Sequence, residues 1–378
     1  MPNYSGKWKL PTVMQAEGAG NWPKPPFSGG EAWMWGAGSN GKLGQGNTTD
    51  YSSPVQVGAL TTWFTGTGAW AQTLMVTGSG TAWAWGAGNF GVLGQGNTTS
   101  YSSPVQIGAL TNWLKMFGGY YAVQATKTDG TLWAWGSGNS GVLGVGDTTN
   151  RSSPVQVGAL TTWLTAAVGY RFTLAAKTDG TLWTWGKNNY GQLGQNNTTD
   201  YSSPVQVGAL TDWLKVSCNY QNSGAVKTDG TLWMWGRNNH GQLGDGSVTT
   251  RSSPVQVGAL TNWSDLSCGV SHTLGLKTDG TVWAWGDGSS GQLGDGTTVN
   301  KSSPVQIGAL ANWSEIGAGL YTSGARTTDK KLYVWGWNSS GQLGQGNTTN
   351  YSSPVQVGAL TTWELVMVSR YYMGGIKS

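Results

Sequence analysis

The residue types that most often carry catalysis or bind metals are scarce in this chain. Its two histidines, His240 and His272, occupy non-equivalent positions of an internal fifty-residue repeat, which does not favour a catalytic triad or a histidine metal cluster. Cys218 and Cys268 occupy equivalent positions, and two cysteines give no disulfide framework. We expect two small buried thiols and neither a catalytic nor a metal site.

Two further patterns suggest chemistry at first sight. The run from Gly41 to Gly46 has the glycine content of a phosphate cradle, but its spacing fits neither the P-loop nor the dinucleotide pattern, and no helix is expected after it. The aspartates of the Asp-Gly pairs at Asp129, Asp179, Asp229 and Asp279 are explained by hairpin turns. The sequence therefore predicts no cofactor and no enzyme.

An internal repeat dominates the sequence. Its period is fifty residues, without insertion or deletion, and there are seven copies. The string SSPVQ begins at Ser52, Ser102, Ser152, Ser202, Ser252, Ser302 and Ser352. Repetition of this length is typical of solenoids and propellers.

The two ends of the repeat region are complementary. Residues 363–378 align with residues 163–178, so the chain ends one strand early, and the missing strand is found at residues 31–36. In a ring, Ser378 would be followed by Gly29 with no residue missing. This pattern favours a closed ring whose last blade is completed by both ends of the chain.

Each copy is read as four short strands. In the fourth copy, residues 172–178 and 181–185 are expected to form a hairpin around Asp179-Gly180. Residues 164–168 precede that hairpin, and residues 204–207 supply an edge strand that tolerates proline. Seven copies of four strands predict an all-β, seven-bladed propeller over residues 29–378.

The composition agrees with this architecture. The 378 residues include 62 glycines and 24 tryptophans, and only 10% are charged. Paired tryptophans such as Trp183 and Trp185 are expected to fill the space between blades. The net charge of +4 is scattered, so no basic stripe for nucleic acid is expected. No membrane span or signal peptide is expected either.

A known family shares this repeat. The segment from Leu266 to Gly296, LSCGVSHTLGLKTDGTVWAWGDGSSGQLGDG, strongly resembles the repeat of the RCC1 family, whose fold is a seven-bladed propeller. The resemblance covers residues 29–378. It implies relatives that exchange nucleotide on a small GTPase, dock on nucleosomes or inhibit β-lactamase. The regular period leaves no room for an inserted catalytic wedge, so no catalytic residue is carried over.

The first 28 residues lie outside the repeats. The string SGKWKLPTVMQAEGAGNWP is similar to a segment of marine bacteriophage tail-fibre and structural proteins. We expect an arm that either folds back on the propeller or docks on a neighbouring subunit. Its candidate assembly residues are Trp8, Leu10, Trp22 and Phe27.

Comparison of the copies indicates a candidate partner surface. The most variable stretch lies just before the first strand of each hairpin and is rich in aromatic and polar residues. A second variable position, Trp337, follows the paired tryptophans. These residues either form a ring of anchors for a protein or sugar or simply line the channel. The candidates are Trp70, Tyr120, Tyr121, Tyr170, Arg171, Tyr220, His272, Tyr321, Trp337, Arg370, Tyr371 and Tyr372.

These observations lead to one main functional prediction and two alternatives. The main prediction is a non-enzymatic structural or adhesive component of a bacteriophage virion that assembles through its arm, in the virion or another extracellular assembly, with protein subunits as partners. The first alternative is a lectin-like binder of cell-surface glycans or receptors. The second is an RCC1-like regulator or protein inhibitor, which we would expect in the cytoplasm.

Overall fold

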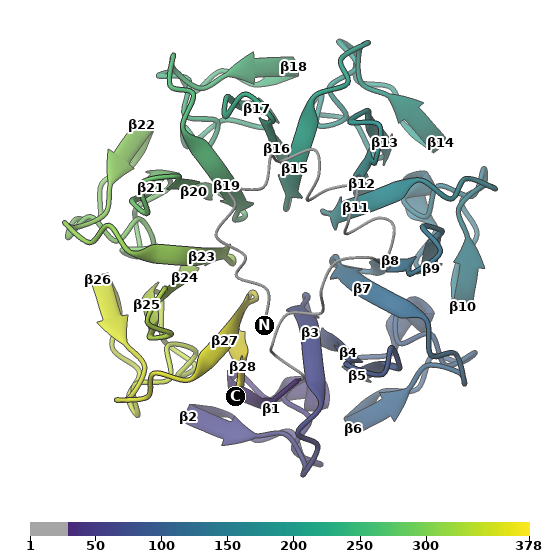
Figure 1. Ribbon diagram of the computed structural model, residues 1–378, viewed down its shortest axis with the longest axis vertical. Helices are drawn as coiled ribbons and strands as arrows, with labels where there is room; N and C mark the ends of the chain where they lie inside the picture. Colours follow the sequence, from purple (N-terminus) through teal and green to yellow (C-terminus); the bar gives the residue numbers. More distant parts are fainter. Residues whose placement is uncertain (1–28) are drawn as a thin grey trace, which may run out of the picture.

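The computed structural model describes residues 29–378, which form seven four-stranded antiparallel sheets arranged in a ring (Figure 1). The prediction of an all-β, seven-bladed propeller is confirmed. Three short 3-10 helices follow the third strands of three blades: η1 (Ser39–Gly41), η2 (Asn89–Gly91) and η3 (Asn139–Gly141). The predicted arm, with Trp8, Leu10, Trp22 and Phe27, lies outside the described residues.

The blades are numbered from the first complete sheet, and each contains four strands of five or six residues. Blade 1 contains β3 (Trp63–Gly68), β4 (Gln72–Thr77), β5 (Ala82–Gly86) and β6 (Tyr101–Gln106). Blade 2 contains β7 (Trp113–Gly118), β8 (Ala122–Lys127), β9 (Leu132–Gly136) and β10 (Arg151–Gln156). Blade 3 contains β11 (Trp163–Val168), β12 (Phe172–Lys177), β13 (Leu182–Gly186) and β14 (Tyr201–Gln206). Blades 4 and 5 comprise β15 (Trp213–Cys218), β16 (Asn222–Lys227), β17 (Leu232–Gly236) and β18 (Arg251–Gln256); and β19 (Trp263–Cys268), β20 (His272–Lys277), β21 (Val282–Gly286) and β22 (Lys301–Gln306). Blades 6 and 7 comprise β23 (Trp313–Ala318), β24 (Thr322–Thr327), β25 (Leu332–Gly336) and β26 (Tyr351–Gln356); and β27 (Trp363–Val368), β28 (Tyr372–Lys377), β1 (Glu31–Gly36) and β2 (Tyr51–Gln56).

Local turn chemistry explains the strand boundaries in blade 3. Gly180 adopts a φ of +77° in the turn between β12 and β13, a conformation that glycine adopts without steric cost. The Asp179 carboxylate accepts hydrogen bonds from the Thr181 backbone N–H at 3.0 Å and from its hydroxyl at 2.7 Å. Pro204 lies in β14, the edge strand of the sheet, where a missing N–H costs no ladder bond.

The last blade is closed by both ends of the described chain, as the sequence predicted. Its strand order is β2-β1-β28-β27, so β1 from the start lies between β2 and β28. Ala32 pairs with Ile376 and Met34 with Gly374 in this antiparallel ladder. Closure removes the free blade ends that an open solenoid would expose.

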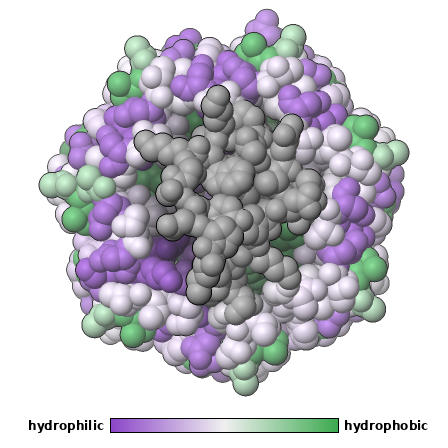
Figure 2. All heavy atoms as spheres, in the orientation of Figure 1, coloured by the Kyte–Doolittle hydropathy of each residue, from purple (hydrophilic) through white to green (hydrophobic). Residues whose placement is uncertain are grey.

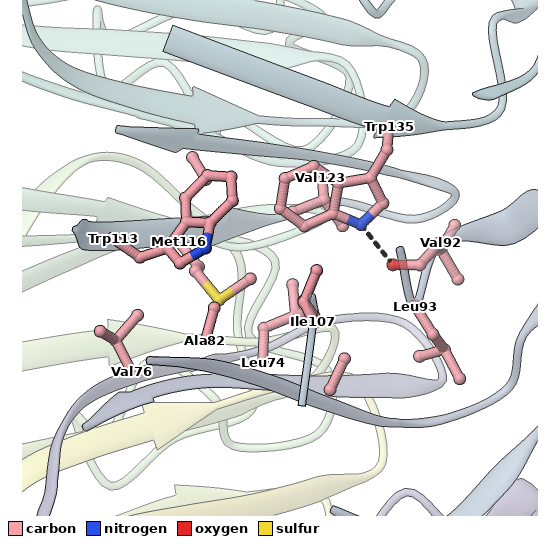
Figure 3. Packing of buried hydrophobic residues seen from close by; sticks show 12 residues of the cluster. Leu74, Val76, Ala82, Val92, Leu93, Ile107, Trp113, Met116, Val123 and Trp135 are labelled. Carbon is pink, nitrogen blue, oxygen red and sulfur yellow. Dashed lines mark hydrogen bonds between the residues drawn. The ribbon is translucent and has the colours of Figure 1, made fainter. Parts of the chain in front are cut away.

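The hydrophobic core is divided among the spaces between neighbouring blades. One cluster combines Leu74 of blade 1 with Trp113, Met116 and Trp135 of blade 2, and Figure 3 shows these side chains packed between the two sheets. The Trp135 indole N–H donates to the Val92 carbonyl at 2.9 Å across the same space. Equivalent tryptophans make the same contact in the other six blades: Trp35, Trp85, Trp185, Trp235, Trp285 and Trp335.

Exposed apolar side chains also repeat around the molecule. Figure 2 shows hydrophobic residues recurring along the outer edge of the ring. One leucine in the loop before the first strand of each blade is 41% to 49% exposed: Leu60, Leu110, Leu160, Leu210, Leu260, Leu310 and Leu360. Because every blade carries this leucine, it does not distinguish one part of the ring as a specific site. Functional residues are better sought where the blades differ.

Candidate functional site

A tight bend joins the first and second strands of each blade, and these bends surround the central channel. The first strands are the innermost strands of the ring (Figure 1). In blade 1 the bend is closed by a hydrogen bond from the Ala69 N–H to the Gln72 carbonyl at 2.9 Å. Each bend therefore leaves two successive side chains, such as Trp70 and Ala71 in blade 1, at the mouth of the channel.

Blades 1 to 4 place a continuous series of aromatic rings at this mouth. The ring of Tyr120 lies 4.4 Å from that of Trp70 and 5.3 Å from that of Tyr170. Tyr220 follows at 5.0 Å from Tyr170, and Tyr121 lies 6.3 Å from both Trp70 and Tyr170. The predicted aromatic residues of four separate repeats therefore form one contact network.

Blades 6 and 7 extend the network in the other direction. The Arg370 guanidinium lies 3.5 Å from the Trp70 ring centroid and 4.6 Å from that of Tyr371. Tyr371 contacts Trp337 at 5.6 Å, and Trp337 contacts Tyr321 at 6.2 Å. We call the connected residues the channel-mouth cluster: Trp70, Tyr120, Tyr121, Tyr170, Arg171, Tyr220, Tyr321, Trp337, Arg370 and Tyr371.

Arg171 is held in a strained conformation. Its φ is +66°, a value that no other residue at these bend positions shares within the described chain, and such a conformation costs a non-glycine residue about 1 kcal/mol. Backbone hydrogen bonds flank it, from the Tyr170 N–H to the Asn219 carbonyl at 3.0 Å and from the Lys187 N–H to the Arg171 carbonyl at 2.8 Å. The guanidinium lies 5.1 Å from the Tyr170 ring centroid, so the cation joins the aromatic network.

Lys42 is a cation that sequence reasoning did not select. It is only 3% exposed, and its ammonium lies 5.7 Å from the ring centroids of both Tyr371 and Tyr372. Burial lowers the pKa of Lys42 to about 8, against the opposing effect of Asp50. The sequence signal that could have identified Lys42 is its repeat position, where the other six copies have valine or glutamine.

Two predicted surface residues lie in the interior instead. Tyr372 and His272 are 1% and 0% exposed. They begin the second strands β28 and β20, and alternation along the chain directs them inward just after two outward-facing bend residues. The Tyr372 hydroxyl donates to the Gln72 carbonyl at 2.6 Å and accepts from the Ala69 N–H at 3.1 Å. Their assignment to the partner surface was therefore wrong, because both are structural.

The hydrogen bonds of His272 fix its neutral tautomer. Its Nε2 lies 2.9 Å from the Ser323 hydroxyl, which itself donates to the Gln292 carbonyl at 2.8 Å. Nε2 is therefore the protonated nitrogen, and Nδ1 has no hydrogen-bond partner within residues 29–378. Burial lowers the pKa of His272 from 6.5 to about 4, with Asp287 acting weakly in the opposite direction.

This buried histidine predicts a loss of stability in acid. The unfolded chain binds a proton below pH 6.5, whereas the folded chain binds it only near pH 4, so the free energy of unfolding falls as the pH decreases through this window. The loss from this group approaches about 3 kcal/mol at pH 4. Urea unfolding between pH 7.5 and 4 measures it. His272→Gln, which copies Gln72 of blade 1, is expected to show a smaller loss; an identical pH dependence in this variant would contradict the assignment.

The remaining candidates for chemistry lie elsewhere in the fold. Cys218 and Cys268 are free, buried thiols, as predicted, and burial raises the pKa of Cys268 to about 12. Among residues 29–378, no three His, Cys, Asp or Glu side chains gather at one place where they could hold a metal ion. No helix of the described chain has the length and apolar character needed to cross a membrane.

Comparisons with known proteins support the fold. The profile of the RCC1-like domain matches residues 31–375. The structure of human WBSCR16 is similar, with a TM-score of 0.82 and 19% identity over 92% of this chain and 98% of that chain. Prp20p from Saccharomyces cerevisiae, described with its binding to Gsp1p and histones, gives a TM-score of 0.80 and 20% identity over 93% and 92% of the two chains.

A further structure, yeast RCC1 (Prp20) bound to Kap60, gives a TM-score of 0.81 and 19% identity over 93% of this chain and 89% of that chain. No curated protein sequence matches the chain. The prediction of a bacteriophage virion component is wrong, because the chain matches the RCC1-like domain family and its fold is that of WBSCR16 and Prp20p. Neither the family match nor these similar structures support the resemblance of the arm to phage proteins. The match over residues 31–375 shows that this chain belongs to the RCC1-like domain family.

Proposed function

We propose that the protein is an RCC1-like regulator that acts inside the cell by binding a protein partner at the channel-mouth cluster. The observation that carries this proposal is the continuous contact network of tryptophan, tyrosine and arginine side chains across six blades. These three residue types dominate the energetics of protein interfaces. The repeated scaffold around the network is the same in every blade, so the network supplies what is specific to this chain.

Two features of the network suit protein recognition. Its rings are half-buried, apart from Tyr120, which is buried, so the others present apolar area and a polar edge without large conformational freedom. The partners named for similar structures are proteins: Gsp1p and histones for Prp20p, and Kap60 for yeast RCC1. A small GTPase is therefore the first partner class that we propose to test.

Nucleotide release provides the experiment. Small GTPases loaded with fluorescent GDP are mixed with the full chain, and release rates and binding are measured. We expect at least one GTPase to bind and release nucleotide faster. Tyr170→Ala and Tyr371→Ala are each expected to weaken binding about thirtyfold, the loss of about 2 kcal/mol expected of interface hot spots.

Tyr201→Ala is the matched control, because Tyr201 lies on the edge strand β14 away from the bends. It is expected to leave binding within about twofold, as for a surface residue outside the interface. Absence of binding to every GTPase would refute the proposed partner class. Equal losses in Tyr201→Ala and Tyr170→Ala would show that the cluster is not the interface.

A further inference from the structure

Within residues 29–378, two arginines in the channel-mouth cluster have no carboxylate partner. Within residues 29–378, the ion pairs involve other cations, and neither Arg370 nor Arg171 is among them. The Nε atoms of both residues are buried and lack a hydrogen-bond partner in the same range. A buried donor without an acceptor is costly, and a charged donor gains most from an anionic acceptor.

The carboxylates in the neighbouring loops already accept hydrogen bonds from backbone N–H groups. Asp50 accepts a hydrogen bond from the Gly38 N–H at 2.8 Å, and Asp200 accepts one from the Asn188 N–H at 2.7 Å. Asp287 is 6% exposed and accepts from the Ser289 N–H at 3.0 Å. These acids hold loop backbones in place, so they do not neutralise the two arginines.

A small cavity of mixed lining lies beside Arg370. Its volume is about 80 Å³, and its lining includes Val168, Val270, Leu320 and Val368 together with Arg370. This volume suits a small aliphatic group rather than an aromatic ring. The channel mouth therefore combines a small recess, lined in part by aliphatic side chains, with donors for anions.

We infer that the channel mouth binds an acidic segment of the partner protein, whose carboxylates pair with Arg370 and Arg171 while one aliphatic side chain enters the cavity. This inference rests on the proposed function and specifies the chemistry of its partner. Charge argues against residues 1–28 as the occupant, because they contain Lys7, Lys9 and Lys24 but only one acid, Glu17. The occupant is therefore a segment of another protein.

Labelled peptides test this directly by fluorescence anisotropy with the full chain. The acidic probe is Gly-Ser-Glu-Asp-Val-Asp-Glu-Ser-Gly, and its neutral counterpart replaces each acid with its amide. We expect the acidic probe to bind about tenfold more tightly, since hydrogen bonds to charged groups are worth at least that factor. Its affinity is expected to fall with rising salt. Replacing its valine with glycine is expected to weaken binding about tenfold.

Variants of the chain locate the contact. Arg370→Gln and Arg171→Gln are each expected to weaken binding of the acidic probe about tenfold. Arg151→Gln is the matched control, because Arg151 lies on the edge strand β10 and pairs with Asp147 at 2.6 Å. Thermal melting of each variant confirms that it is folded. Arg370→Lys retains charge without the guanidinium stack and is expected to bind at an intermediate level.

The outcomes separate this inference from the proposed function. Failure of the acidic probe to bind, equal binding of the amide probe, or equal losses in Arg151→Gln and Arg370→Gln would each overturn the inference. If a GTPase still binds the wild-type chain in such a case, the proposed function stands and only its acidic docking element is wrong. If the acidic probe binds as expected but no GTPase does, the proposed partner class fails while the site remains.

Discussion

Deletion of residues 369–378 is expected to abolish the folded propeller. The deletion removes β28, which lies between β27 and β1 in blade 7. The hairpin of β1 and β2 would then lose its connection to β27, and isolated hairpins are marginally stable at best. The buried side chains of Tyr372, Met373 and Ile376 are lost as well, each worth about 1.5 to 3 kcal/mol. Their sum is comparable to the whole stability of a typical protein.

Ring closure adds a second cost to this deletion. The Tyr372 hydroxyl connects blade 7 to blade 1 through the Gln72 carbonyl, the Ala69 N–H and the Thr73 hydroxyl, at 2.6, 3.1 and 3.0 Å. Without β28, these buried polar groups of blade 1 each lose one hydrogen-bond partner. We expect most of the truncated chain to be insoluble and its soluble fraction to lack a cooperative thermal transition, as measured by circular dichroism.

A circular permutant provides the control for chain closure. Joining Ser378 directly to Gly29 recreates the turn that Thr178 and Asp179 occupy in blade 3, because the repeats align without a gap. New ends are placed in the exposed loop between Asn97 and Thr98. This permutant is expected to fold cooperatively. A truncated chain as stable as the permutant would show that closure by β28 is dispensable.

The repeat made most of the fold predictable, because seven aligned copies average out local ambiguity. The turn at Asp179-Gly180, the edge strand containing Pro204 and the closure between Ala32 and Ile376 all follow from repeat position. The first three residues of that edge strand, 201–203, were missed. The sequence just before Pro204 lacks a strong strand pattern. The strand starts at Tyr201 because Tyr201 pairs with Gly186 of β13, beyond an irregularity in the ladder between Thr184 and Gly186.

The candidate site was predictable only in part. Variation between copies selected Trp70, Tyr120 and Arg370, whose side chains the bends bring into contact. Variation alone does not separate an exposed bend residue from the buried residue that follows it, which is why His272 and Tyr372 were misplaced. The residues that pack against a buried position differ from blade to blade, so the buried position varies between copies as well. The prediction of a phage virion component failed for another reason, since a rigid repeated scaffold carries little information about function.

Trp185 and Trp183 allow the contribution of inter-blade packing to be measured within one strand, β13. Trp185 is 0% exposed, donates from its indole N–H to the Val142 carbonyl of blade 2 at 2.9 Å, and lies 5.9 Å from the Trp163 ring. A Cβ added at Gly144 would lie 2.6 Å from the same indole nitrogen, so the ring fits closely against the neighbouring blade. Trp185→Ala therefore leaves a cavity that the rigid ring of blades does not readily close, and we expect a loss of about 3 to 5 kcal/mol.

Trp183→Ala is the matched comparison and is expected to cost less. Trp183 is half-buried, and its indole N–H donates within its own blade to the Thr181 hydroxyl at 2.8 Å. Its loss removes the contact with the Lys177 ammonium, 3.7 Å from its ring centroid, and part of its apolar burial, together about 1 to 2 kcal/mol. Urea unfolding of both variants measures the difference. Equal losses would refute the view that the indole contact to the preceding blade, rather than tryptophan content alone, holds the ring together.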